Sequence, residues 1–227
     1  MDRTVNTLFM LMSVDGKIST GATDDYDVDS DLPRLPGVAE GLPQYYELER
    51  QTDLWSCNSA RVLVKIGYNE RTTAPPDRSD VSFILVDNAG HFNATAIRYL
   101  AASLRRVVIA TTRPAYDTYG CDNVDVISYG GHVDFADLFR QIRSRYGAER
   151  VTIQTGGTLN GVLLRAGLID FVHVVVAPVL VGGADVVTLV DGPNPRSLAD
   201  LGVLRLVESR ALDHSYLFLK YAVHPAS

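Results

Sequence analysis

Residues 151–164 read VTIQTGGTLNGVLL, an apolar run rich in β-branched residues, then two glycines, then a second apolar run. The first run has the composition of a buried strand, and the second has the spacing of a helix. A glycine carries no Cβ, so an anion can approach the main chain closely, and the unpaired amides of the first helical turn then point at it. The pattern predicts either a phosphate cradle at Gly156 and Gly157 or a plain tight turn from strand to helix.

Strand and helix patterns alternate along most of the chain. Predicted strands cover residues 4–13, 54–57, 81–86, 106–110, 124–128, 150–154 and 169–177, and predicted helices cover 43–51, 58–65, 94–103 and 134–145. Such alternation favours a mostly parallel sheet with helices on both faces. Two adjacent alternating runs at 203–212 and 215–223, with Asp213-His214 between them, predict an antiparallel hairpin. No linker is visible, so we expect a single α/β domain over residues 1–227.

Composition excludes several classes of protein. With 46% hydrophobic and 21% charged residues, the chain of 227 residues is able to bury a substantial core. The net charge of −6 argues against a general nucleic-acid binder, because such binding needs basic residues that neutralise phosphates. No apolar run reaches the roughly 20 residues that a membrane-spanning helix needs. We therefore expect a cytoplasmic protein without membrane or nucleic-acid partners.

Metal binding is not expected. Cys57 and Cys121 have neither CxxC spacing nor a nearby histidine cluster, so we expect free buried thiols. The irregular loop 19–42 carries five aspartates between residues 24 and 31 but lacks the later glycine and glutamate of a calcium loop. An exposed acidic lid is the preferred interpretation of this loop.

Ligands of open α/β sheets bind beyond the carboxyl ends of the strands, which selects the loops after residues 13, 57, 110 and 154. These loops carry small polar residues and glycines: Ser13, Asn58, Ser59, Thr111, Thr112, Gly156, Gly157 and Thr158. Their hydroxyls and amides suit one extended phosphate-bearing ligand, as a dinucleotide is.

The continuation AGLID at 166–170, the apolar run 171–183 and the segment SVDGKI at 13–18 carry a family resemblance. Together they resemble the reductase domain of the bifunctional riboflavin-biosynthesis deaminase-reductases. The likeness is close over 151–183, fair over 4–20 and 203–223, and poor between 21 and 80. It implies a dihydrofolate reductase-like fold, a three-layer α/β/α arrangement with a mostly parallel mixed sheet and a C-terminal antiparallel hairpin.

The resemblance also implies a cofactor, NADPH, and roles for particular residues. It assigns the cofactor pyrophosphate to Gly156, Gly157, Thr158 and Leu159, the adenosine end to Thr111, Thr112 and Arg113, and the nicotinamide and substrate to segment 13–18. Within this segment we expect Ile18 to contact the cofactor and Ser13 the substrate. At the edge of the sheet, Asn58 and Ser59 are further expected cofactor contacts, and Gln154 is an expected substrate contact. An arginine such as Arg113 suits a 2′-phosphate because its fork bonds two oxygens at once. A proton for the reaction could come from Asp15, Lys17 or water.

Several residues depart from the family pattern. The sequence has Asn58-Ser59-Ala60-Arg61 after the second strand and lacks the Asp-Pro segment that ends in a substrate-binding arginine; it also has Gln154 where the family has a glutamate. The cofactor is therefore better supported than a phosphoribosylamino-pyrimidine substrate. We expect an NADPH-dependent reductase that transfers a hydride to a small heterocycle and resembles the 5-amino-6-(5-phosphoribosylamino)uracil reductase of riboflavin biosynthesis. The alternatives are riboflavin-pathway activity on the ribosylamino-pyrimidine phosphate itself, a pterin reductase and a non-catalytic NADP-binding protein.

The resemblance further implies a homodimer. The apolar run from Val172 to Val181 suits a subunit interface, and a central strand buried on both faces explains it equally well.

Overall fold

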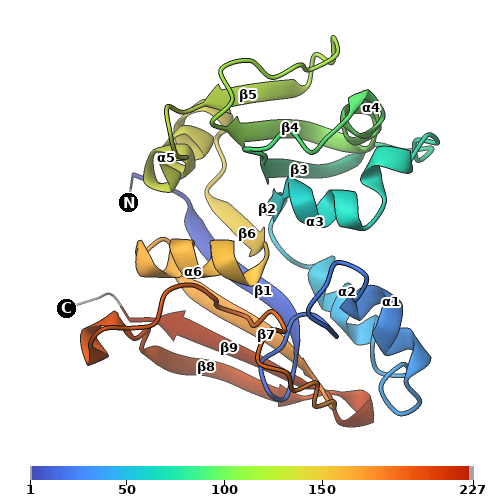
Figure 1. The fold of residues 1–227 in the computed structure, drawn as a ribbon, viewed down its shortest axis with the longest axis vertical. Coiled ribbons are helices and arrows are strands. Elements are labelled where there is room, and N and C mark those ends of the chain that lie inside the picture. Colours follow the sequence, from blue (N-terminus) through green and yellow to red (C-terminus); the bar gives the residue numbers. More distant parts are fainter. Residues whose placement is uncertain (1, 225–227) are drawn as a thin grey trace. The chain divides into compact units, whose positions relative to one another are not determined.

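The chain forms two units, each built from two separate stretches of sequence (Figure 1). The computed structural model describes residues 2–224. Unit 1 contains the chain up to Val5 together with Asp53–Thr155, and unit 2 contains Asn6–Thr52 together with the chain from Gly156 onward. That residues 1–227 act as a single domain stays a prediction, and its two ends, residue 1 and residues 225–227, lie outside the described residues.

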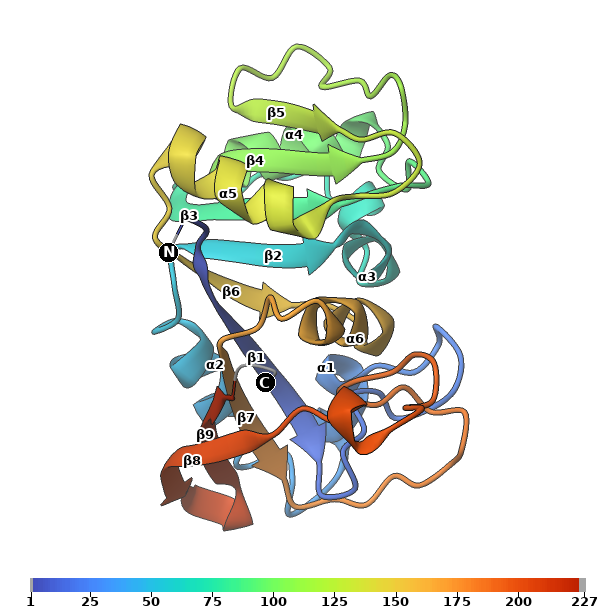
Figure 2. The same cartoon turned by 90° about the vertical axis from the view of Figure 1, so that its left-hand side faces the viewer.

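Unit 1 is a parallel α/β unit. Its strands are β2 (Trp55–Ser59), β3 (Ser79–Val86), β4 (Leu104–Thr111), β5 (Val124–Ser128) and β6 (Arg150–Gln154), in the order β5-β4-β3-β2-β6, and every neighbouring pair is parallel. Its helices are α3 (Ala60–Lys65), α4 (Ala94–Ser103) and α5 (Phe135–Tyr146), with a 3-10 turn at Tyr68–Glu70. Figure 2 shows α4 and α5 on opposite faces of these strands.

The two faces of unit 1 follow from the twofold period of its strands. On β4, Val107 and Ile109 belong to the same buried cluster as Ile97 and Leu100 of α4. Helix α5 buries Leu138, Phe139 and Ile142 completely, at the spacing of three to four residues that places side chains on one helical face. Both faces of the parallel strands are therefore covered, as the alternating sequence pattern predicts.

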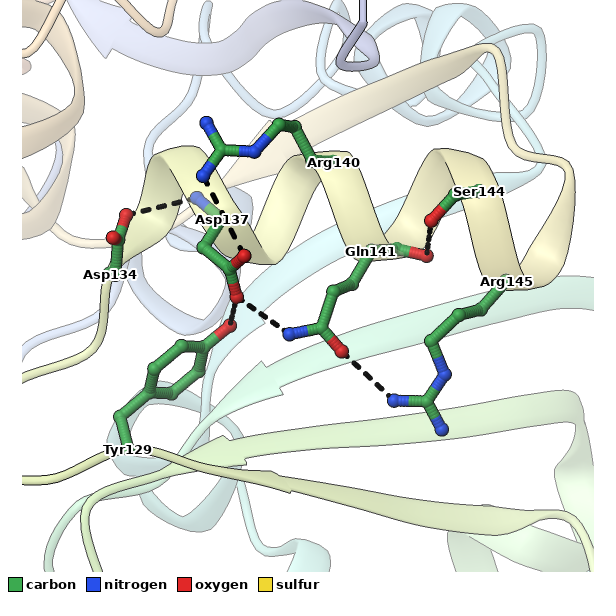
Figure 3. Close-up of polar contacts among 7 residues, drawn as sticks. All are labelled: Tyr129, Asp134, Asp137, Arg140, Gln141, Ser144 and Arg145. Atoms are coloured by element: carbon green, nitrogen blue, oxygen red, sulfur yellow. Dashed lines mark hydrogen bonds and ion pairs between the residues drawn. The ribbon is translucent and has the colours of Figure 1, made fainter.

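The start of α5 is fixed by side chains of its own first turns (Figure 3). The carboxylate of Asp134 accepts a hydrogen bond from the amide of Asp137 and caps the helix. The Asp137 carboxylate accepts hydrogen bonds from the Tyr129 hydroxyl at 3.1 Å and from the Gln141 side chain at 2.6 Å. The Gln141 bond, first, and the Tyr129 bond lower the pKa of Asp137. The chain that leaves β5 is thereby tied to the helix that follows.

Unit 2 contains a mixed arrangement of strands. These are β1 (Val5–Ser13, whose first residue belongs to unit 1), β7 (Phe171–Ala177), β8 (Leu204–Ala211) and β9 (Leu217–Val223), in the order β1-β7-β9-β8. Strands β1 and β7 are parallel, and β7–β9 and β8–β9 are antiparallel. The helices are α1 (Val28–Asp31), α2 (Pro43–Glu49) and α6 (Gly157–Arg165), with 3-10 turns at Leu32–Arg34, Leu198–Asp200 and Asp213–Ser215.

Strand β7 is the central strand of unit 2, between β1 and β9. Val174 and Val175 are 2% and 0% exposed, so the apolar run of this strand is explained by burial within its own chain. His173 is half-buried and its ring lies against Phe171 and Phe218. Within β7 a subunit interface is therefore not needed to account for the run, whereas Leu180, beyond the strand, is 73% exposed.

The acidic loop is more ordered than the sequence suggests, because helix α1 and a 3-10 turn lie within residues 19–42. Asp27 caps α1 by accepting from the amide of Asp29, Asp31 accepts from the hydroxyl of Thr20, and Asp29 accepts from the hydroxyl of Tyr46 at 2.6 Å. These carboxylates shape the loop locally, and its role as a lid stays a prediction.

Among the described residues, no helix is long and apolar enough to cross a membrane, and no group of three potential ligands is placed to hold a metal ion. Cys57 is free and buried, and its burial raises its pKa to about 12. Cys121 is free but only half-buried, so the prediction of a buried thiol is wrong there.

Candidate functional site

The carboxyl ends of the parallel strands of unit 1 meet at one edge. Asn58 near the end of β2 pairs with Gln154 at the end of β6, and Thr111 at the end of β4 pairs with Ser128 of β5. Ser59 ends β2 at the cap position of α3, although its side chain makes no capping bond. The structure thus brings Asn58, Gln154 and Thr111 to the edge where open α/β sheets bind ligands.

Asn58 and Gln154 are joined through a third polar side chain. The Ser56 hydroxyl donates to Oε1 of Gln154 at 3.0 Å and accepts from Nδ2 of Asn58 at 3.0 Å. Asn58 and Ser56 are buried, so this chain of hydrogen bonds holds β2 and β6 in register. The glutamine that replaces the family's glutamate therefore has a neutral acceptor role within the sheet.

Three predicted residues follow β4. The hydroxyl of Thr111 is buried, donates to the carbonyl of Asp87 at 2.6 Å and accepts from the amide of Arg113 at 3.1 Å. The amide of Thr112 donates to Oδ1 of Asn88 at 3.0 Å. The side chain of Arg113 is exposed, and its Nη1 donates to the carbonyl of Ala89 at 2.9 Å. Of these three residues, Arg113 alone carries a charged side chain, and it is exposed.

In unit 2, the start of α6 leaves backbone amides available. Gly156 occupies the cap position and the cap makes no side-chain hydrogen bond. Among the hydrogen bonds of residues 2–224, none uses the amides of Gly157, Thr158 or Leu159. Thr158 is exposed and Leu159 is half-buried. These amides and the positive end of the helix dipole suit an anion.

The two glycines of the pair differ in their surroundings. A Cβ on Gly156 would meet nothing within 4 Å, whereas a Cβ on Gly157 would lie 2.3 Å from the carbonyl oxygen of Thr188 and 2.5 Å from the carboxylate of Asp191. The amide of Asp191 also donates to the carbonyl of Gly157 at 2.9 Å. Gly157 is therefore needed for the packing of segment 188–191, and Gly156 is the open member.

The segment 13–18 is tied to a distant part of unit 2 through Asp15. Its carboxylate accepts from the hydroxyl of Ser13 at 2.6 Å and from the amides of Val181 and Gly182 at 3.1 and 2.7 Å. These bonds, with the Ser13 bond first, lower the pKa of Asp15 to about 2. A carboxyl group with this pKa is ionised near neutral pH, which disfavours it as a proton donor.

Lys17 and Ile18 continue the same connection. The ammonium of Lys17 donates to the carbonyls of Gly183 and Val186 at 2.8 and 3.0 Å, and the amide of Ile18 donates to the carbonyl of Val187 at 3.0 Å. Within unit 2, the predicted catalytic pair therefore braces segment 181–187. Their catalytic roles stay predictions.

A cavity of about 830 Å³ lies at the opposite, amino edge of unit 1. Four arginines and four carboxylates are among its lining residues, and two pairs bond directly, Arg150 with Asp53 at 3.0 Å and Arg106 with Asp125. Because these charges balance and partly pair, the cavity shows no preference for an anion. Sequence reasoning did not find it, and it shares none of the predicted site residues.

The parallel strands of unit 1 carry polar residues at their carboxyl edge, and a helix that begins with a glycine follows β6 in the sequence. These features are typical of the class of α/β proteins that bind ligands at this edge. Residues 4–218 match the family described as the RibD C-terminal domain, and the chain belongs to this family.

A curated relative and two solved structures extend this result. The 2,5-diamino-6-ribosylamino-4(3H)-pyrimidinone 5′-phosphate reductase of Methanothermobacter thermautotrophicus is 29% identical over 224 residues, covering 93% of this chain and 94% of the relative. RibD of Acinetobacter baumannii has a TM-score of 0.70 at 18% identity, covering 99% of this chain and 59% of that chain. The riboflavin biosynthesis reductase Rib7 of Saccharomyces cerevisiae has a TM-score of 0.63 at 12% identity, covering 99% of this chain and 91% of that chain.

The structural likenesses show the fold alone, because their identities are low. They confirm the predicted α/β class, and the antiparallel pairing of β8 with β9 confirms the predicted C-terminal hairpin. The match to the RibD C-terminal domain confirms the resemblance on which the prediction rested. The chain spans only 59% of the length of the RibD chain that it matches.

Proposed function

We propose that the chain is a pyridine-nucleotide-dependent reductase that transfers a hydride to a ribosylamino-pyrimidine 5′-phosphate. The observation that carries the proposal is the likeness to the archaeal reductase, which covers 94% of that relative and 93% of this chain. The diamino-pyrimidinone phosphate named for the archaeal relative is therefore the candidate substrate.

The proposed cofactor is NADPH, which supplies the hydride when bound. In unit 2, the backbone at Gly156 and the amides of Gly157, Thr158 and Leu159 hold a phosphate. In unit 1, Arg113 holds the 2′-phosphate, because its guanidinium is exposed at the carboxyl edge.

The remaining predicted residues have supporting roles in the proposal. Thr111, Thr112, Asn58 and Ser59 shape the edge of unit 1, and Ser13 and Ile18 shape the braced segment of unit 2. The proposed substrate lies beside Gln154, whose neutral amide accepts from Ser56. Asp15 fixes segment 181–182, so proton delivery falls to Lys17 or water.

Segment 188–191 limits where the phosphate binds. The Asp191 carboxylate lies against Gly157 and accepts from the Thr188 hydroxyl at 2.6 Å. A phosphate at the same place would meet a like charge. The open backbone at Gly156 is therefore the proposed point of contact.

The test is a titration of the purified protein with NADPH and with NADH, in which the melting temperature is measured at each concentration. A ligand that binds only the folded state raises the melting temperature. Oxidation of NADPH upon addition of the archaeal relative's substrate supports the reductase. Tight NADPH binding with no oxidation on this substrate or on a pterin favours the non-catalytic alternative. Turnover with a pterin alone favours the pterin reductase. No stabilisation by either nucleotide at millimolar concentration refutes the proposal.

We also propose that the protein is a homodimer, with exposed apolar side chains of β8 at its interface. Leu204, Leu206 and Val207 are 40%, 50% and 54% exposed on this edge strand of unit 2. Light scattering on the wild type and on Leu206→Lys tests this. A monomeric mass for the wild type removes the dimer.

A further inference from the structure

Asp87 is a fully buried carboxylate directly after β3, at the carboxyl edge of unit 1. Its Oδ1 accepts from the amides of Gly90 and His91, both at 2.9 Å, and its Oδ2 accepts from the amide of Phe92 at 3.4 Å. The side chain therefore closes the turn that runs from β3 toward α4. A buried carboxylate with so many backbone donors fixes the loop around it.

The same carboxylate holds the loop that follows β4. The Tyr116 hydroxyl donates to Oδ2 of Asp87 at 2.5 Å, and the Thr111 hydroxyl donates to the Asp87 carbonyl at 2.6 Å. Burial, first, and the hydrogen bond to Asp87 raise the pKa of Tyr116 far above its ordinary value, so the phenol stays a donor. Asp87 is thus the shared acceptor that joins the loops after two neighbouring strands.

Arg113 lies across the turn that Asp87 closes. Its Nη1 donates to the carbonyl of Ala89 at 2.9 Å, and a Cβ on Gly90 would lie only 2.5 Å from this Nη1. Gly90 has φ +73°, a left-handed conformation that favours glycine. The place of the guanidinium therefore depends on a turn whose amides bond to Asp87.

A guanidinium held in this way loses less conformational freedom when it binds phosphate. One nitrogen is engaged by the Ala89 carbonyl, and the exposed remainder of the fork is available for a doubly charged oxyanion. NADPH carries such an oxyanion, its 2′-phosphate, and NADH does not. The position of Arg113 therefore affects the relative affinity for the two nucleotides.

We propose that Asp87, with Tyr116, is a positioning residue that holds Arg113 for the 2′-phosphate of the cofactor and thereby sets the preference for NADPH over NADH. The inference rests on the proposed reductase function. It assigns the preference to a buried carboxylate that touches neither cofactor nor substrate.

The experiment measures the dissociation constants of NADPH and NADH for the full chain by calorimetric titration. Arg113→Ala weakens NADPH about 10- to 100-fold, the range for hydrogen bonds to charged groups, and leaves NADH within about twofold. Asp87→Asn weakens NADPH about 3- to 20-fold, and Tyr116→Phe about 2- to 10-fold, again with NADH little changed. In the Arg113→Ala background, Asp87→Asn adds no further loss in the ratio of the two constants.

Tyr129→Phe is the matched control, because it removes another tyrosine-to-aspartate hydrogen bond, to Asp137 on α5. It leaves the ratio unchanged. If Asp87→Asn does not fold, Tyr116→Phe decides the question.

The proposal is overturned if Arg113→Ala changes the ratio while Asp87→Asn and Tyr116→Phe do not, or if these two weaken NADPH and NADH equally. Equal binding of both nucleotides by the wild type overturns it as well and leaves the reductase proposal standing. Binding of neither nucleotide refutes the reductase proposal itself, which separates the two failures.

Discussion

Replacing Gly157 by alanine tests whether segment 188–191 packs on the start of α6. The new Cβ would lie 2.3 Å from the carbonyl oxygen of Thr188, which belongs to the backbone. An ordinary carbon-to-oxygen contact is roughly 3.3 Å, so the segment would have to move by about 1 Å. Its attachments resist this movement, since Asn160 donates to the carbonyl of Leu189 at 2.9 Å and Asp191 donates to Gly157 at 2.9 Å.

The expected loss follows from these contacts. Overpacking of this kind costs about 1–3 kcal/mol of the free energy of unfolding. For a chain of this size, each kcal/mol lowers the melting temperature by about 2–4 °C, which gives a decrease of about 2–12 °C. The intrinsic helix preference of alanine offsets less than about 1 kcal/mol of this loss at the first helical position.

Gly156→Ala is the matched control, because its Cβ would meet nothing within 4 Å and its φ of −73° is open to alanine. The expected loss is about 0.5 kcal/mol, since glycine is a somewhat better cap residue than alanine. Urea unfolding of both variants, followed by circular dichroism, measures the difference. Equal stability of the two variants would refute the packing of Thr188 and Asp191 against Gly157.

Three further predictions concern other parts of the chain. The hydrogen bonds that hold the pKa of Asp15 at about 2 rather than 3.8 stabilise the fold above pH 3.8, and this stabilisation is lost as the pH falls toward 2. The urea midpoint of Asp15→Asn is therefore less acid-sensitive than that of the wild type in this range. The control is Asp122→Asn, a change of an exposed aspartate, which behaves like the wild type. Equal acid profiles of Asp15→Asn and the wild type contradict the prediction. Burial raises the pKa of Cys57 to about 12, so this thiol resists iodoacetamide at pH 8 in the folded protein, whereas the half-buried Cys121 reacts first. Mass spectrometry of the labelled peptides measures the two rates. Rapid labelling of both cysteines is inconsistent with the structure. Asp134→Ala removes the cap of α5 and lowers the free energy of unfolding by about 1 kcal/mol in urea titrations, and Asp134→Ser restores most of it; an unchanged midpoint for the alanine variant would show that the cap is dispensable.

The order and type of the strands and helices could be predicted because their signals are local. The continuous apolar run within the predicted strand 106–110 and the helical period in 134–145 correspond to β4 and α5, whose bounds differ by two residues or fewer. The terminal runs 203–212 and 215–223 form β8 and β9 as expected. The helical turn within loop 19–42 could not be predicted, because α1 has only four residues and its Asp29 is held by the hydroxyl of Tyr46.

The site could be predicted only in part, because its decisive contacts join residues far apart in the sequence. The motif Asp15-Gly16 indicates a turn, but nothing local shows that the Asp15 carboxylate binds the amides of Val181 and Gly182. Likewise, residues 87–90 indicate a turn, and only the structure shows that Asp87 also holds Tyr116.

The glycine pair illustrates the same limit most directly. The strand and the helix on either side of the two glycines were predicted correctly. The sequence pattern of a phosphate cradle does not distinguish one glycine from the other. They differ because the later segment 188–191 covers Gly157 with a carbonyl and a carboxylate and leaves Gly156 open. A side chain at Gly157 is thus excluded by packing, and only Gly156 has open space at its Cβ position, so a loss of binding in a Gly157 variant alone would not identify a phosphate site. Loss of NADPH binding in Gly156→Ala, with stability nearly unchanged, is the result that distinguishes the cradle from the turn.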